Sequence, residues 1–341
     1  MRKDRYSISE DWLARHREEA VEPDLPIIDA HHHLWDRIGN RYLLPELLAD
    51  VSGGHDIRAT IYVEATSMYR ADGPDELRSL GETEFANGVA AMAHSGVYGS
   101  MRACAGIIAR IDMSLGENVA CLLAAHRRAA SDRFKGIRLH AQWDGSGIAT
   151  GPQAVPGKDL LRDERIRRGF AQLSTLGLVG EIVVFHPQLP DVADFARQFE
   201  DTTIVLNHIG LPLGIGPYAG KREEVFLEWR RGIRAVAACQ NVWVKLGGMA
   251  GHLIGFDFRS RETPPGSDEL AALWSRYLWT VIDAFGPERC LFESDFPVDK
   301  EGCSYTVLWN AFKKLTTRYS ASERAAMFSG TAAKLYGISI L

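Results

Sequence analysis

The sequence predicts an α/β fold, a (β/α)8 TIM barrel in a single domain with an N-terminal helical extension, and three observations favour it. Short apolar runs recur eight times along the 341 residues. Segments with helical spacing of apolar residues lie between these runs, as parallel βαβ units require. The first run leads into three consecutive histidines, whereas a doubly wound sheet, the competing fold, usually carries a glycine-rich phosphate loop there.

The expected elements follow from this alternation. The strands are expected at 26–33, 59–65, 103–111, 134–140, 178–186, 202–208, 241–248 and 290–297. The helices are expected at Asp75–Ser95, Glu117–Ala130, Asp159–Leu176, Asp191–Phe199, Glu223–Cys239, Glu269–Phe285 and Tyr305–Tyr319, with a Ser-capped last segment, SASERAAMFSGTAAKLYGI. A helix-like segment near Ser7–Ala20 precedes the first strand. We therefore expect a helical extension over residues 1–25 and a barrel over residues 26–341.

Composition limits the classes of partner. A net charge of -5, with 24% charged and 46% hydrophobic residues, is typical of an ordinary globular protein, and the basic residues are spread along the chain. This distribution disfavours a nucleic-acid groove or a membrane surface as partner and favours a small molecule. Five scattered cysteines, no secretion signal and no run of about 20 apolar residues indicate a cytoplasmic protein with reduced thiols. A homo-oligomer is compatible with the sequence.

The segment Asp29-Ala30-His31-His32-His33 ends the first expected strand. Because side chains alternate along a strand, His31 and His33 should share one face at the barrel mouth, and His32 should point the other way. Two imidazoles spaced in this way can bind one Zn²⁺. A purely structural hydrogen-bond network is the alternative interpretation.

Three further expected strands also end in a polar residue, namely His186, His208 and Asp295. A single histidine at a strand end is more often a hydrogen-bonded core residue than a ligand. The carboxyl ends of all barrel strands meet at one face, however, so the set is expected to converge. His31, His33, His186 and Asp295 would give three nitrogen ligands and one carboxylate around a single ion, with room for water.

The order of these residues resembles the amidohydrolase superfamily. The segments IIDAHHHLWD, FKGIRLH, NVWVKLGGM and LFESDFPVDK are similar, more narrowly, to a branch of metal-dependent TIM-barrel hydrolases. That branch includes sugar-acid lactonases, 4-sulfomuconolactone hydrolase and 2-pyrone-4,6-dicarboxylate lactonase. The similarity extends from about Pro26 to Leu335, nearly the whole chain, and its motifs are specific for the superfamily rather than for a substrate.

The resemblance implies roles for the strand-end residues. His31, His33 and His186 would be metal ligands, His208 would bind the metal or polarise the substrate carbonyl, and Asp295 would be both ligand and proton shuttle. The cofactor would be one divalent ion, Zn²⁺ or alternatively Mn²⁺. Binuclear members carry a bridging lysine or glutamate on strand three or four, whereas FKGIRLH offers Arg138 and His140 and places Lys135 at the wrong end of the strand. Some lactonases of the branch work without metal, so a metal-free site stays open.

The substrate contacts and the reaction complete the expectations. Arg138, His140, Glu64, Lys245 and Tyr69 lie at or just after strand ends and are candidates for binding an anionic substrate, with an outward salt bridge as the alternative for each.

We expect a lactonase that opens a small carboxylated lactone with water activated by metal or by Asp295. An amide hydrolase and a metal-dependent non-oxidative decarboxylase are the alternatives, and Asp29 keeps the second open. A barrel without turnover is disfavoured, because all four strand-end groups are present. Glu293, which has the parity of Asp295, is expected deeper in the barrel beside a cation.

Overall fold

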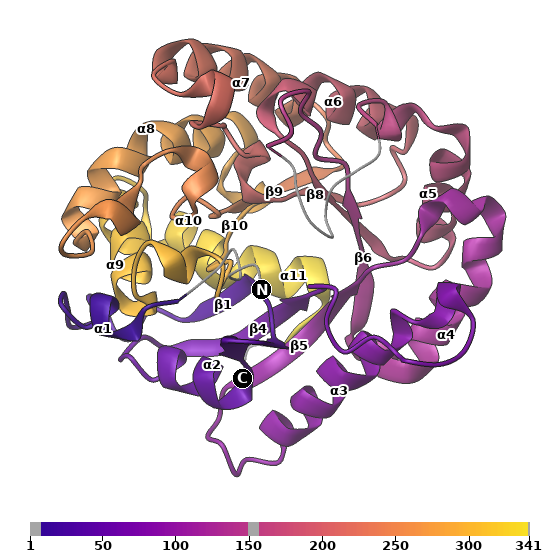
Figure 1. Cartoon of the computed structure of the whole chain (residues 1–341), viewed down its shortest axis with the longest axis horizontal. Helices are drawn as coiled ribbons and strands as arrows, with labels where there is room; N and C mark the ends of the chain where they lie inside the picture. Colours follow the sequence, from indigo (N-terminus) through magenta and orange to yellow (C-terminus); the bar gives the residue numbers. More distant parts are fainter. Residues whose placement is uncertain (1–7, 149–156, 340–341) are drawn as a thin grey trace.

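The computed structural model describes residues 8–148 and 157–339, and in them eight parallel strands form one sheet whose order follows the chain (Figure 1). The strands are β1 (Ile27–His32), β4 (Ile57–Val63), β5 (Arg102–Ala109), β6 (Phe134–His140), β7 (Val179–Val183), β8 (Ile204–Leu206), β9 (Val242–Leu246) and β10 (Cys290–Phe292). A small antiparallel pair, β2 (Trp35–Arg37) and β3 (Asn40–Tyr42), follows β1.

The sheet closes between its first and last strands. The backbone N–H of Asp295 donates to the carbonyl of His31 at 2.9 Å, and the N–H of His33 donates to the carbonyl of Phe296 at 2.8 Å. Helices surround the ring of strands on the outside (Figure 1). The predicted (β/α)8 barrel is therefore confirmed.

Most helices occupy the predicted segments with somewhat different bounds, and one further helix follows β3. They are α2 (Leu44–Val51), α3 (Leu80–His94), α4 (Val119–Ala130), α5 (Glu164–Thr175), α6 (Leu189–Gln198), α7 (Arg222–Ala237), α8 (Ser267–Phe285), α9 (Tyr305–Leu315), α10 (Ala321–Ala325) and α11 (Thr331–Tyr336). Side-chain caps fix several starts, and the predicted cap Ser320 forms a capping box with Glu323 at α10. In the described ranges, no helix combines the length and apolarity that a membrane crossing requires.

The N-terminal extension is helical only over α1 (Glu10–Leu13), so the helix expected at 7–20 is mostly absent. Residues 1–7 lie outside the described part. Tertiary contacts explain the difference, because the carboxylate of Glu18 accepts hydrogen bonds from the backbone N–H of Ser267 at 2.7 Å and from the side chain of Asn310 at 2.9 Å. These contacts hold the segment against α8 and α9 and override its modest helix propensity.

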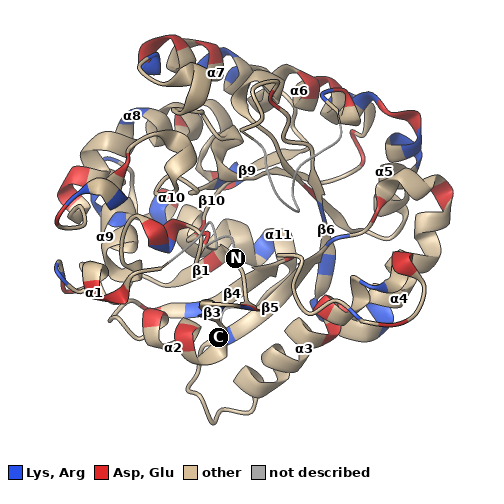
Figure 2. Cartoon of the chain, viewed as in Figure 1, with Lys and Arg blue, Asp and Glu red and all other residues tan. Residues whose placement is uncertain are grey.

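The core lies between the strands and the outer helices. Trp229, Trp274 and Trp309 are fully buried there. Behind β10, the ring of Phe292 packs against Phe312 and Phe328 with centroids 4.7 and 4.6 Å apart. This packing fixes the strand that leads to Asp295. On the outer helices, charged residues of both signs are interspersed (Figure 2).

Candidate active site

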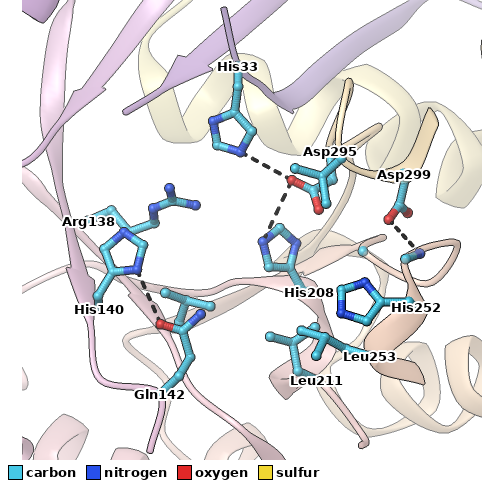
Figure 3. A pocket seen from close by; sticks show the side chains of 14 residues that line it. His33, Arg138, His140, Gln142, His208, Leu211, His252, Leu253, Asp295 and Asp299 are labelled. Atoms are coloured by element: carbon cyan, nitrogen blue, oxygen red, sulfur yellow. Dashed lines mark hydrogen bonds and ion pairs between the residues drawn. The ribbon is translucent and has the colours of Figure 1, made fainter. Parts of the chain in front are cut away.

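Four of the predicted strand-end residues meet at the mouth of the barrel. His31 is in β1 and His33 follows it, while His208 and Asp295 come two and three residues after β8 and β10. The Nε2 atoms of His31 and His33 lie 3.2 Å apart. The Oδ1 atom of Asp295 lies 3.6 Å from Nε2 of His31, 3.3 Å from that of His33 and 3.9 Å from that of His208. Figure 3 shows His33 and His208 facing the Asp295 carboxylate from two sides.

The other nitrogen of each of these three rings faces a fixed acceptor. Glu293, buried below the mouth, places one carboxylate oxygen 2.9 Å from Nδ1 of His31 and the other 2.8 Å from Nδ1 of His208. Nδ1 of His33 lies 2.8 Å from the carbonyl oxygen of Val63. Nδ1 of His33 therefore donates a proton to this carbonyl oxygen, and its neutral ring keeps a lone pair on Nε2. Nδ1 of His208 donates to Glu293, whereas Nδ1 of His31 lies between Glu293 and Lys245, whose Nζ is 3.3 Å away. The Nε2 atoms of all three rings point toward Asp295.

This arrangement fits one divalent metal ion. Ligand atoms about 2.1 Å from a tetrahedral ion are about 3.4 Å from one another, close to the spacing of the atoms of His31, His33 and Asp295. The Oδ1 atom of Asp295 is buried and has no hydrogen-bond partner. A second candidate group, His31, His208 and Glu293, is less suitable because Glu293 already pairs with the backbone N–H and Nδ1 of His208. Glu293 instead orients the histidine rings from outside the metal site.

Electrostatics separate the members of the cluster. Burial, with Lys245 and two other histidines nearby, lowers the pKa of His31 well below 6.5. Burial also disfavours the charged form of His208, but the carboxylates of Asp295 and Glu293 outweigh it and raise the pKa of His208 to about 9. Burial works against the charge of Asp295, and His208 and His33 keep its pKa below 3.8. Without a metal, the cluster therefore holds an Asp295 carboxylate beside a His208 imidazolium.

Arg138 and His140 form the opposite wall and share one buried partner. Glu64 accepts a hydrogen bond from Nε of Arg138 at 2.8 Å and pairs with Nε2 of His140. Nη1 of Arg138 lies 3.3 Å from Nε2 of His31.

These groups line a cavity at the barrel mouth. Its polar wall includes His33, Arg138, His140, His208 and Asp295. The remaining wall comes mainly from the loops after β6, β8, β9 and β10, and its residues are Gln142, Val183, Leu211, Gly248, Gly251, His252, Leu253, Val298 and Asp299.

The structure does not bring His186 into the cluster. Strand β7 ends at Val183, and His186 begins a 3-10 turn with Pro187. Its Nδ1 accepts the N–H of Leu213 at 3.3 Å, and its ring packs on Tyr218 with centroids 5.0 Å apart. The expected third nitrogen ligand is thus displaced, and His208 occupies the corresponding side of the cluster.

Three of the five expected substrate contacts do not line this cavity. Glu64 and Lys245 are fully buried below it, where Lys245 lies 2.7 Å from Glu181 and 3.3 Å from Nδ1 of His31. Tyr69 lines a neighbouring cavity that shares only His140 with the first. Arg138 and His140 are the two that face the mouth.

Sequence reasoning located Glu293 beneath the site but missed two other residues. Glu181 supports Lys245, and its signal was a lone acidic residue inside the apolar run LVGEIVVFH. His252 lines the cavity from the loop after β9, and no spacing or motif in the sequence indicated it. His32 turns away from the cluster as expected, toward Thr60 at 2.9 Å.

A closed barrel whose rim gathers histidines and an aspartate beneath a small cavity defines the class of barrel hydrolases. The model of the family described as "Amidohydrolase" matches residues 28–338. The chain belongs to this amidohydrolase family, and the resemblance predicted from its motifs is confirmed.

Individual relatives agree with this assignment. Protein y4mH of Sinorhizobium fredii, which carries the description uncharacterized, is 29% identical over 92% of this chain and 99% of its own length. An L-fucono-1,5-lactonase of Burkholderia multivorans is 31% identical over 52% of this chain, a match that spans only 57% of the lactonase. An amidohydrolase of Burkholderia multivorans solved with bound Zn is 26% identical, covers 92% of this chain and 99% of its own, and has a TM-score of 0.70.

Proposed function

We propose that this protein is a lactonase, a hydrolase that opens the ring of a small hydroxylated or carboxylated lactone. The observation that carries the proposal is the convergence of three histidine Nε2 atoms on the buried, unpartnered Oδ1 of Asp295 at the base of the cavity. The similarity to L-fucono-1,5-lactonase supports the choice of a lactone over an amide.

Each residue has a definite part in this proposal. His31, His33 and Asp295 would hold one divalent ion, Zn²⁺ or Mn²⁺, which supplies Lewis-acid activation of water and of the carbonyl. Asp295 takes a proton from the attacking water. The water oxygen adds to the carbonyl carbon, the ring C–O bond breaks, and Asp295 returns the proton to the leaving oxygen, giving a hydroxy acid.

The wall opposite Asp295 would bind the substrate. The Arg138 guanidinium is held in one orientation by Glu64, so it can donate to a carbonyl or carboxylate oxygen without loss of side-chain freedom. His208, which faces the same point as the metal ligands, would donate to or polarise the carbonyl oxygen as charge develops there.

A lactone screen tests the proposal. Purified protein is treated with a chelator, divided, and assayed with and without added Zn²⁺ or Mn²⁺ against L-fucono-1,5-lactone and other small lactones, with acid release as the readout. We expect turnover of at least one lactone and its loss on chelation. Activity that persists after chelation would remove the metal from the proposal and leave the lactonase. No turnover of any lactone, ester or amide would overturn it.

A further inference from the structure

His252 is a cavity-lining residue to which the proposed reaction gives no part. It lies in the loop after β9 and forms the side of the cavity next to Leu253 and Asp299 (Figure 3). Its Nδ1 lies 3.0 Å from Oε1 of Glu301, and its backbone N–H donates to the same oxygen at 2.6 Å. Glu301 is buried, whereas the His252 side chain keeps 36% of its surface exposed. The Nδ1 side of the ring is thus held by Glu301, and its other side is accessible to a ligand.

Two buried carboxylates hold the loop that carries His252. Asp299 accepts the N–H groups of Ala250 and Gly251, both at 3.0 Å, and Glu301 accepts that of His252. Burying two carboxylates is costly unless hydrogen bonds satisfy them. Here they bind three consecutive backbone amides, and both come from the segment that begins with Asp295. The loop is therefore fixed in position relative to Asp295.

Backbone packing holds the same loop from its other sides. Gly248 has a φ of +67°, and a Cβ there would lie 2.6 Å from the Cβ of His208, so only glycine allows this approach. Further along, the N–H of Gly214 donates to the carbonyl of Leu253 at 2.8 Å. A side chain on so constrained a loop is preorganised for binding.

The contact with Glu301 determines what the open end of the ring can do. Because Nδ1 donates its proton to the carboxylate, the lone pair of the neutral ring is on Nε2. In the described part of the chain no group bonds this nitrogen. Arg138, across the cavity, has only N–H donors to offer. A hydroxyl group of a ligand needs an acceptor as well as donors, and His252 Nε2 supplies one.

We propose that His252, positioned by Glu301, accepts a hydrogen bond from a hydroxyl group of the substrate and thereby selects hydroxylated lactones. The inference rests on the proposed lactonase function and adds the substrate class to it. A site built to hydrogen-bond a hydroxyl discriminates strongly against the analogue that lacks it.

Two lactones with the same ring test the inference. L-Fucono-1,5-lactone carries ring hydroxyls, and δ-valerolactone has none. For His252→Phe we expect KM for the hydroxylated lactone to rise about tenfold, the value of one hydrogen bond of about 1.4 kcal/mol, with kcat within about threefold. With δ-valerolactone, which has no hydroxyl to offer, KM should change by less than about threefold. Glu301→Gln should give a smaller rise in KM, because the ring is kept but held less firmly.

A control and a second readout separate the possible failures. His94→Phe changes an exposed histidine at the end of α3 and should not alter the kinetics with either lactone. Titration calorimetry with L-fuconate, the hydroxy acid product, measures binding without turnover, and His252→Phe should weaken it about tenfold. Equal effects of His252→Phe on both lactones, or unchanged binding of L-fuconate, would overturn the inference. If no lactone is turned over but His252→Phe still weakens L-fuconate binding about tenfold, only the lactonase proposal is overturned. If no lactone is turned over and L-fuconate binding is unchanged, both proposals are overturned.

Discussion

His186 and His208 follow neighbouring strands in similar sequence contexts, yet only His208 reaches the reaction centre. Both are buried. His208 has a φ of 52°, and this left-handed conformation turns its ring toward Glu293 and Asp295. His186 also starts a 3-10 turn, but without a positive φ, and it contacts Leu213 and Tyr218 instead. The comparison teaches that the backbone conformation just after a strand decides whether a strand-end residue joins a barrel site.

The two surroundings also give the rings different charge states. Burial lowers the pKa of His186 to about 4, and Asp144 offsets this only in part. The pKa of His208 is instead raised to about 9 by two carboxylates despite burial. One ring is therefore a neutral structural group, and the other is an ionisable group in the candidate active site.

The largest expected difference between the two regions is in catalysis. Asp295→Asn keeps the shape of the cluster but removes the proton acceptor, so kcat for the lactone should fall by about 10²- to 10⁴-fold. Asp144→Asn, beside Tyr218 and near His186, is the matched control and should change kcat less than about threefold. Steady-state kinetics of both variants checks this. Similar rates for Asp295→Asn and the parent would remove Asp295 from the mechanism.

Metal binding should also distinguish the candidate active site from the surroundings of His186. His33→Ala removes a proposed ligand, and we expect Zn²⁺ affinity to fall more than about 100-fold, since loss of outer partners alone costs 10- to 100-fold. His186→Ala should leave affinity nearly unchanged. Competition with a chromogenic chelator gives the affinity, and elemental mass spectrometry gives the stoichiometry. If His186→Ala lost the ion and His33→Ala kept it, the ligand set would be wrong.

A smaller effect is expected on stability, where the site can be compared with the surface. Arg138→Met leaves Glu64 buried without its charged partner and should lower the free energy of unfolding by about 3–5 kcal/mol. Arg276→Met breaks the exposed pair with Glu223 and should leave the urea midpoint nearly unchanged. Urea denaturation of the two variants measures both. A tolerated Arg138→Met would mean that His140 alone compensates the charge of Glu64.

The sequence was sufficient for the barrel and for most of the cluster. Alternation along a strand correctly paired His31 with His33. It also put Glu293 below Asp295, although both residues follow β10 and Asp295 has a φ of 53°. His186 lies outside the cluster, because its ring turns toward Leu213 and Tyr218 where the chain leaves β7. Lys245 was expected at the mouth but lies deeper, where Glu181 compensates its charge. Such placements depend on contacts between distant segments, which local patterns do not encode.

Proton NMR of the histidine rings gives the subtlest test of the comparison. In metal-stripped protein, the His208 ring should stay protonated up to about pH 9, whereas His186 should stay neutral down to about pH 4. Because the folded pKa of His208 is above 6.5, its contribution to stability is full below pH 6.5 and is lost as pH rises through about 9. The lowered pKa of His186 has the opposite sign and costs stability as pH falls from 6.5 toward 4. Asp295→Asn should lower the pKa of His208 and leave that of His186 unchanged. Equal titration of both rings would show that the two regions share one electrostatic environment.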